Sequence, residues 1–201
     1  MKKLLKIVNI DGVRGIGVTT QTNMLRLSLQ KMGLSVKSLK MEKTVDSISK
    51  CLSEIESIIN ENSNDVVVIE GSMARAISID ILSGMSQSLI SDKYREIINK
   101  YEVLNHKYGI ANILLISDDL KMCEDRIKKR KRLLNQQDMS DVDFNLEKDI
   151  VKHMNLLDNT TIIKSIKFHI INIEKDDYML NVQDAIITYL DNNFQTKKLK
   201  I

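Results

Sequence analysis

Short runs of aliphatic residues recur along the chain and are separated by longer segments whose apolar positions return every three or four residues. The clearest run is Val66-Val67-Val68-Ile69, which is typical of a strand buried on both faces. The run at 34–39 instead alternates apolar and polar residues, as a half-buried strand does. These runs predict five strands, at 4–10, 34–39, 65–70, 110–117 and 167–173.

The segments between the runs predict amphipathic helices. Gly33 is expected to end the first helix in a left-handed conformation, Asp118 and Asp119 to cap the fourth, and Asp141 to cap the fifth. The stretch 71–84 is less periodic and carries no predicted element. The predicted helices are 19–32, 45–62, 87–108, 118–134, 141–157 and 177–194.

Strand and helix alternate along the sequence, which predicts an α/β fold: a parallel five-stranded sheet flanked by helices. No linker, repeat or low-complexity segment interrupts the pattern, so residues 1–201 are expected to form a single domain. The tail at 195–201 is expected to fray.

Composition narrows the class of protein. Hydrophobic residues make up 43% of the chain and charged residues 28%, which excludes general disorder. No apolar run reaches the roughly 18 residues that cross a bilayer, so no membrane partner is expected. The two cysteines are too few for a disulfide framework and favour a cytoplasmic location. The net charge of +3 does not demand a nucleic-acid partner.

Three of the seven glycines fall within six residues, between the first predicted strand and the first predicted helix. Glycine lets the backbone curl so that several N–H groups converge on one anion in front of a helix N-terminus. This segment predicts a phosphate-binding loop, although a plain tight turn would explain the same glycines. The loop residues are Gly12, Val13, Arg14, Gly15, Ile16, Gly17, Val18, Thr19 and Thr20.

Two positions in the loop decide its chemistry. Thr19 occupies the place whose hydroxyl binds Mg²⁺ in phosphate loops, whereas Val18 stands where such loops carry lysine. Arg14 is a candidate for the missing cation because it lies within the loop. Glu70 ends a predicted strand at the edge where open parallel sheets bind ligands. It is a candidate to hold Mg²⁺ or accept a proton, or else it caps the turn at Gly71.

The segment 10–21, in which Thr-Thr-Gln closes the loop, resembles the opening of the thymidylate kinases. The segment 123–130 is similar to the helix that enters their lid. The resemblance implies a P-loop NTPase fold of the nucleotide kinase type, with ATP and Mg²⁺ as cofactors and a lid near 126–141. It also implies that Arg126 and Arg130 act catalytically by closing over the ATP phosphates. A solvated basic face is the alternative for these two arginines.

The resemblance further implies a nucleoside monophosphate as the acceptor substrate. Glu42, Arg75 and Arg95 are the candidate residues for binding it, and both arginines are equally compatible with surface positions. A homodimer through the 87–108 helix is also implied. The apolar stripe on that helix would suit a dimer, but packing within one subunit explains it equally well. The stripe consists of Ile90, Tyr94, Ile97, Ile98, Tyr101 and Leu104.

Three functions follow as expectations. The first is a nucleotide kinase that transfers the γ-phosphate of ATP to a nucleoside monophosphate. The second is a catalytically impaired relative that binds nucleotides or protein partners, because Val18 replaces the lysine. The third is a kinase acting on nucleotides within DNA, which the basic run at 128–132 would hold by its phosphates.

Overall fold

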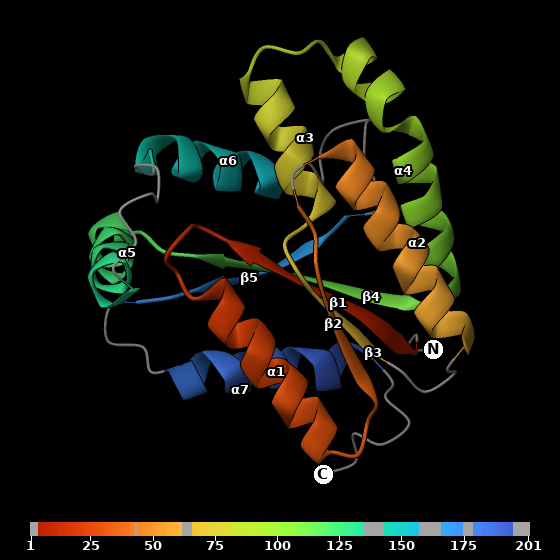
Figure 1. Ribbon diagram of the computed structural model, residues 1–201, viewed down its shortest axis with the longest axis horizontal. Helices are drawn as coiled ribbons and strands as arrows, with labels where there is room; N and C mark the ends of the chain where they lie inside the picture. Colours follow the sequence, from red (N-terminus) through yellow and green to blue (C-terminus); the bar gives the residue numbers. More distant parts are fainter. Residues whose placement is uncertain are drawn as a thin grey trace.

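A computed structural model of the protein describes residues 4–42, 44–61, 66–134, 143–156, 166–174 and 179–194, with the backbone alone at 130–134, 144, 155 and 156. Five parallel strands form one sheet in the order β2-β3-β1-β4-β5, which confirms the predicted α/β class (Figure 1). The strands are β1 (Leu5–Gly12), β2 (Val36–Lys40), β3 (Val66–Glu70), β4 (Gly109–Ile116) and β5 (Phe168–Asn172). The helices are α1 (Val18–Lys31), α2 (Val45–Glu61), α3 (Met73–Leu82), α4 (Gln87–Lys107), α5 (Leu120–Leu134), α6 (Phe144–Leu156) and α7 (Met179–Asn193).

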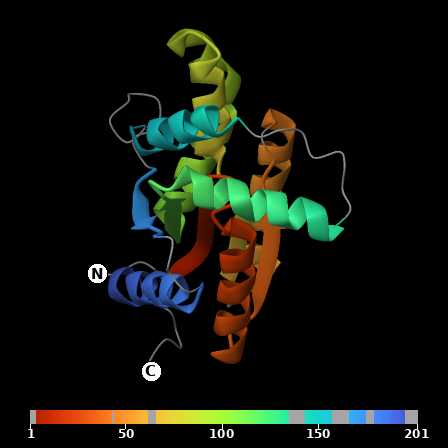
Figure 2. The same ribbon diagram turned by 90° about the vertical axis from the view of Figure 1, so that its left-hand side faces the viewer.

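The helices form two layers. Helices α1 and α7 cover one face of the sheet, while α2, α3 and α4 cover the other, with α6 packed against α3 (Figure 1). Figure 2 looks onto the edge where the strands end, and α5 lies across this edge. Among the described residues, no helix is both long and apolar enough to span a membrane.

The strand order contains one point at which the direction of the connections between strands reverses. From β1 the chain crosses β3 to reach β2, whereas from β3 it crosses β1 to reach β4. The connections that leave these two neighbouring strands therefore run in opposite directions. Open α/β sheets bind ligands outside the carboxyl ends of strands at such a point. In this chain the point lies between Gly12 and Glu70, at the ends of β1 and β3.

Burial follows position in the sheet. Strand β1 is buried along its whole length because it has a strand on each side and a helical layer on each face. Strand β2 lies at the edge and is exposed at Lys37 and Lys40. Lysines on an edge strand discourage pairing with another chain.

Helix α3 is the element that the sequence pattern did not predict. The helix periodicity depends on a contrast between a buried and an exposed face. Residues 73–78 are all buried, so this contrast is missing from the first half of the helix. The stretch 71–84, to which the pattern assigned no element, therefore contains a helix at Met73–Leu82.

The start of α6 also differs from the prediction. The helix begins at Phe144, and Asp143 caps it by accepting hydrogen bonds from the N–H groups of Asn145 and Leu146 at 3.0 and 3.1 Å. The expected cap, Asp141, lies outside the described residues. Helix α5 begins at Leu120, and of its two expected caps Asp119 is confirmed, because its Oδ1 accepts from the N–H of Met122 at 3.0 Å.

Candidate functional site

The glycine loop runs from the end of β1 to the start of α1. Gly15 and Gly17 have φ values of 86° and 111°, in the left-handed region that favours glycine. A Cβ atom on Gly15 would lie 2.5 Å from the carbonyl oxygen of Cys123, so α5 packs directly against the loop. The predicted use of glycine for backbone curvature is thus visible at both positions.

The loop leaves backbone donors available in front of α1. The N–H of Ile16 donates to the carbonyl of Val13 at 3.1 Å, and the first bond of the helix runs from Gln21 to Gly17. Among the described residues, none accepts a hydrogen bond from the N–H groups of Gly15 or Gly17. Such donors at a helix N-terminus attract anions.

Thr19 and Glu70 contact each other beside the ends of β1 and β3. The Thr19 hydroxyl donates to Glu70 Oε1 at 2.8 Å, joining the first turn of α1 to the end of β3. Strand register brings them together, because Glu70 pairs with Ile10, two residues before the loop. Carboxylate and hydroxyl oxygens are the ligand types that Mg²⁺ accepts, usually together with waters and substrate phosphates. The two residues thus fit a magnesium ion at the mouth of the loop.

Arg126 is the cation that contacts the loop from α5. Its Nη1 atom donates to the carbonyl oxygen of Ile16 at 3.2 Å. Val18, at the position of the usual lysine, presents a half-buried apolar side chain. The other candidate, Arg14, is turned toward α6, where its Nε lies 3.7 Å from Glu147 Oε1. Of these two arginines, Arg126 therefore has the direct side-chain bond to the loop backbone.

Arg75 lies beneath the loop and is nearly fully buried. Its Nε donates to Asp11 Oδ1 at 2.9 Å and its Nη1 to Glu147 Oε2 at 2.8 Å, while Nη2 donates to the carbonyl of Gly12. Burial lowers the pKa of the Arg75 guanidinium, but the two carboxylates outweigh burial and hold the pKa above its ordinary value. Arg75 was predicted to bind substrate, and the structure occupies all three of its guanidinium nitrogens with protein acceptors.

The other predicted site residues are Glu42, Arg95 and Arg130, and the structure shows no contact between their side chains and the loop among the residues that it describes. Glu42 is exposed just beyond β2, and its neighbour Met41 donates its N–H to the carbonyl of Glu70 at 2.9 Å. Arg95 is exposed on α4 and forms an ion pair with Asp92. The side chain of Arg130 lies outside the described part of the chain, as do residues 135–142 of the predicted lid.

Asp11 and Glu147 belong to the site although neither was predicted there. The sequence pattern could have indicated that Glu147 is buried, because Glu147 shares a helix face with the apolar residues Ile150, Val151 and Met154, which are buried. A carboxylate at such a position needs a buried partner. That partner is Arg75, and the sequence did not indicate its position because it lies on α3, the helix that the pattern did not predict.

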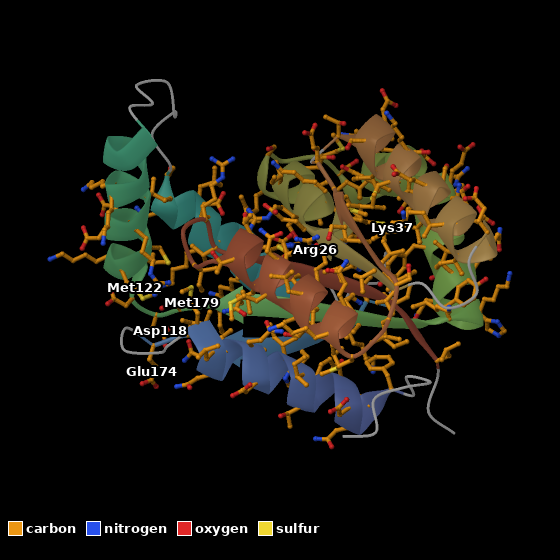
Figure 3. The ribbon with its side chains drawn as sticks, turned by 60° about the horizontal axis from the view of Figure 1, so that its bottom comes forward. Arg26, Lys37, Asp118, Met122, Glu174 and Met179 are labelled. Atoms are coloured by element: carbon orange, nitrogen blue, oxygen red, sulfur yellow. The ribbon has the colours of Figure 1, made fainter. Side chains whose placement is uncertain are left out.

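The starts of α5 and α7 border the same end of the sheet. Figure 3 labels Asp118, which precedes α5, and Met122 of α5 on the same side of the view as Glu174 and Met179, which precede and begin α7. Gln21 of α1 ties this region to the loop helix, because its Nε2 donates to the carbonyl of Met179 at 3.0 Å. Burial raises the pKa of the Cys123 thiol, more than Arg126 lowers it, which keeps this thiol protonated near the loop.

Comparisons with known proteins add no family to these observations. The chain matches no protein-family model, and a search of curated proteins gives no match. Within the described residues, no group of three or more histidine, cysteine, aspartate or glutamate side chains is arranged to hold a metal ion. The two-residue arrangement of Thr19 and Glu70 is therefore the feature that bears on metal binding.

Proposed function

We propose that the chain is a P-loop nucleotide kinase resembling thymidylate kinase, which transfers the γ-phosphate of ATP to a nucleoside monophosphate. The observation that carries this proposal is the 2.8 Å hydrogen bond between Thr19 and Glu70 at the mouth of a glycine loop. It supports the proposal because the ends of β1 and β3 bring together open N–H donors, a helix N-terminus and two side chains with oxygen atoms that Mg²⁺ can accept.

Each residue has a role in this proposal. Gly15 and Gly17 present their N–H groups to the phosphates, and Thr19 and Glu70 hold Mg²⁺, which neutralises charge on the phosphates when it is bound. Arg126 supplies positive charge from α5, in the absence of a lysine at position 18. Removing one charged or polar donor from such a site typically costs about 10²–10³ in rate. A slow kinase is consistent with that loss.

A nucleotide-binding protein without transfer activity is the second candidate. Val18 is the observation that favours it, because backbone donors and Mg²⁺ would still bind phosphates without the lysine. Transfer to nucleotides within DNA stays the third prediction. The basic run on which it rests is described with side chains only as far as Lys129.

Transfer of labelled γ-phosphate from ATP, with Mg²⁺, to a panel of nucleoside monophosphates and single-stranded DNA tests the proposal. Transfer to one mononucleotide is expected, and Lys100→Ala should leave the rate unchanged because Lys100 pairs with Glu56 on a distant surface. Binding of ATP with no transfer to any acceptor would favour the second candidate. Transfer to DNA alone would favour the third.

A further inference from the structure

A buried cluster of charges lies under the glycine loop and joins three elements. Arg75 of α3, Asp11 of β1 and Glu147 of α6 expose 7%, 4% and 5% of their surfaces. The guanidinium of Arg75 bonds both carboxylates and the carbonyl oxygen of Gly12. A lysine ammonium is a single point and does not reproduce this planar fork.

Glu147 extends the cluster to the loop backbone. Its Oε2 atom, which accepts from Arg75, also accepts from the N–H of Arg14 at 3.4 Å. Two backbone groups at the start of the loop, the carbonyl of Gly12 and the N–H of Arg14, are thereby directed toward α3 and α6. The N–H groups of Gly15 and Gly17 follow immediately and have no acceptor among the described residues.

The surroundings of Arg75 argue against direct contact with a phosphate. Two carboxylates bond Arg75, and one of them also lies 3.7 Å from Arg14, so the positive charges of the cluster are already balanced by protein carboxylates and do not attract a further anion. The anion would also have to displace a protein acceptor from the guanidinium. Replacing a buried ion pair by apolar residues is often neutral or stabilising, so stability alone is a weak reason for this cluster.

We propose that Arg75 and Glu147 are positioning residues, which fix the first part of the glycine loop so that its later N–H groups face the anion. This inference rests on the proposed function, because it takes the loop to be the phosphate site. In this inference Arg75 does not contact the acceptor nucleotide. It acts on phosphate binding indirectly, by holding the backbone of the loop. It also makes α6 part of the phosphate site, although α6 is 133 positions from the loop in sequence.

Two conservative variants test the clamp formed by Arg75 and Glu147. Glu147→Gln keeps one oxygen that can accept from both Arg75 and Arg14, but it removes the negative charge that strengthens both hydrogen bonds and replaces the second oxygen, which faces Arg14 Nε at 3.7 Å. Arg75→Lys keeps the charge and loses the fork. Glu56→Gln is the matched control, because Glu56 is an exposed carboxylate paired with Lys100 at 3.7 Å.

The readouts are hydrogen exchange of residues 13–19 without nucleotide and the Kd for ATP with Mg²⁺. Both variants should exchange these amides about tenfold faster and bind ATP about tenfold more weakly, because each loses or weakens hydrogen bonds that a charged group strengthens. Exchange in α2 should stay unchanged, which separates loss of positioning from general destabilisation. The control should match the wild type in every readout.

Unchanged exchange of residues 13–19 in both variants would overturn the clamp. A weaker Kd for the nucleoside monophosphate, with normal exchange and normal ATP binding, would return Arg75 to substrate contact. If the wild type does not bind ATP, the proposed function fails, whereas the exchange measurement still decides whether the clamp exists. If Arg75→Lys does not fold, Glu147→Gln carries the test.

Discussion

At the residue scale, the contact between Thr19 and Glu70 gives the most direct prediction about activity. Glu70→Gln keeps the size of the side chain and an oxygen for the Thr19 hydroxyl, but removes the charge that would hold Mg²⁺. Phosphate transfer should fall about 10²–10³-fold at fixed Mg²⁺ concentration. Steady-state assays over a range of Mg²⁺ concentrations check this, and excess Mg²⁺ should partly restore the rate. A variant as active as the wild type would exclude Glu70 from the site.

A second prediction concerns Gly15. Its control is Gly84, which has the same φ of 86°. Alanine is strained at this φ, at a cost of about 1–2 kcal/mol. Space around Gly84 is open, whereas a Cβ on Gly15 would lie 2.5 Å from the carbonyl oxygen of Cys123. Gly15→Ala should therefore lose a further ~1–3 kcal/mol of unfolding free energy relative to Gly84→Ala. Urea unfolding of both variants measures the difference, and equal losses would contradict the close packing of α5 on the loop.

Single residues also show where sequence reasoning succeeded and where it stopped. Thr19 and Glu70 were both predicted as metal ligands, because each stands at a recognisable place relative to a strand end or a helix start. Their hydrogen bond confirms that they lie together, and metal binding stays a prediction. The sites of Arg75 and Glu147 were not predictable as a pair. Their contact depends on how α3 and α6 pack, and no local pattern records that packing.

At the scale of elements, the burial of α4 decides between the two explanations of its apolar stripe, a homodimer contact and packing within one subunit. Five of the six residues of the stripe are buried within this chain, and the sixth, Ile98, is half-buried and packs against the same core. The buried five are Ile90, Tyr94, Ile97, Tyr101 and Leu104. Packing within one subunit therefore accounts for the stripe, and a homodimer through this helix loses the support that the stripe gave it. The exposed apolar residues of α4 are Leu89 and Val103.

Neighbouring residues on α4 make this testable. Leu104→Ala should cost about 2–5 kcal/mol of unfolding free energy, because Leu104 is 3% exposed and its loss leaves a cavity. Val103→Ala should change the stability by less than about 0.5 kcal/mol, since Val103 is 63% exposed. Thermal unfolding at several protein concentrations checks both. A concentration-dependent Tm that Val103→Ala lowers would instead indicate a dimer through this face.

The elements differ in how much their sequence revealed. Strand β3 could be predicted from the sequence because four aliphatic residues in a row are typical of a strand covered on both faces. Helix α2 could be predicted because only one of its faces is buried, so its apolar residues recur every three or four positions. Helix α3 was missed because it lies between other elements and lacks an exposed face along its first residues. Predictability therefore followed the contrast between the two sides of each element.

At the scale of the whole molecule, the fold class followed from the alternation of strand and helix, but the strand order did not. Nothing local in Val36–Lys40 states that β2 lies beyond β3 at the edge of the sheet. That order places β1 and β3 side by side and so brings Glu70 next to the glycine loop. The family resemblance remains a source of proposals about function.

Acid should weaken the packing of β5 against α7. His169 stacks on Tyr189 with ring centroids 3.9 Å apart, and burial lowers the pKa of the histidine. The unfolded chain therefore binds a proton more readily, so stability is lost as the pH falls through the ordinary histidine value of about 6.5 toward the lowered pKa. Between pH 7.5 and 5, the Tm of the wild type should fall about 1–3 °C more than that of His169→Phe. Parallel pH profiles of the two proteins would contradict this.

The central position of β1 has a consequence for the growing chain on the ribosome. The hydrogen bond between Asn9 and Asn112 joins β1 to β4 across 103 positions of sequence. At a synthesis rate of about 5–20 residues per second, β1 waits roughly 5–20 seconds before β4 has been made. During that interval one edge of an apolar strand has no neighbour, and nascent chains are prone to aggregate through such edges. We therefore expect the strand that leads into the glycine loop to be open to aggregation until β4 has been made.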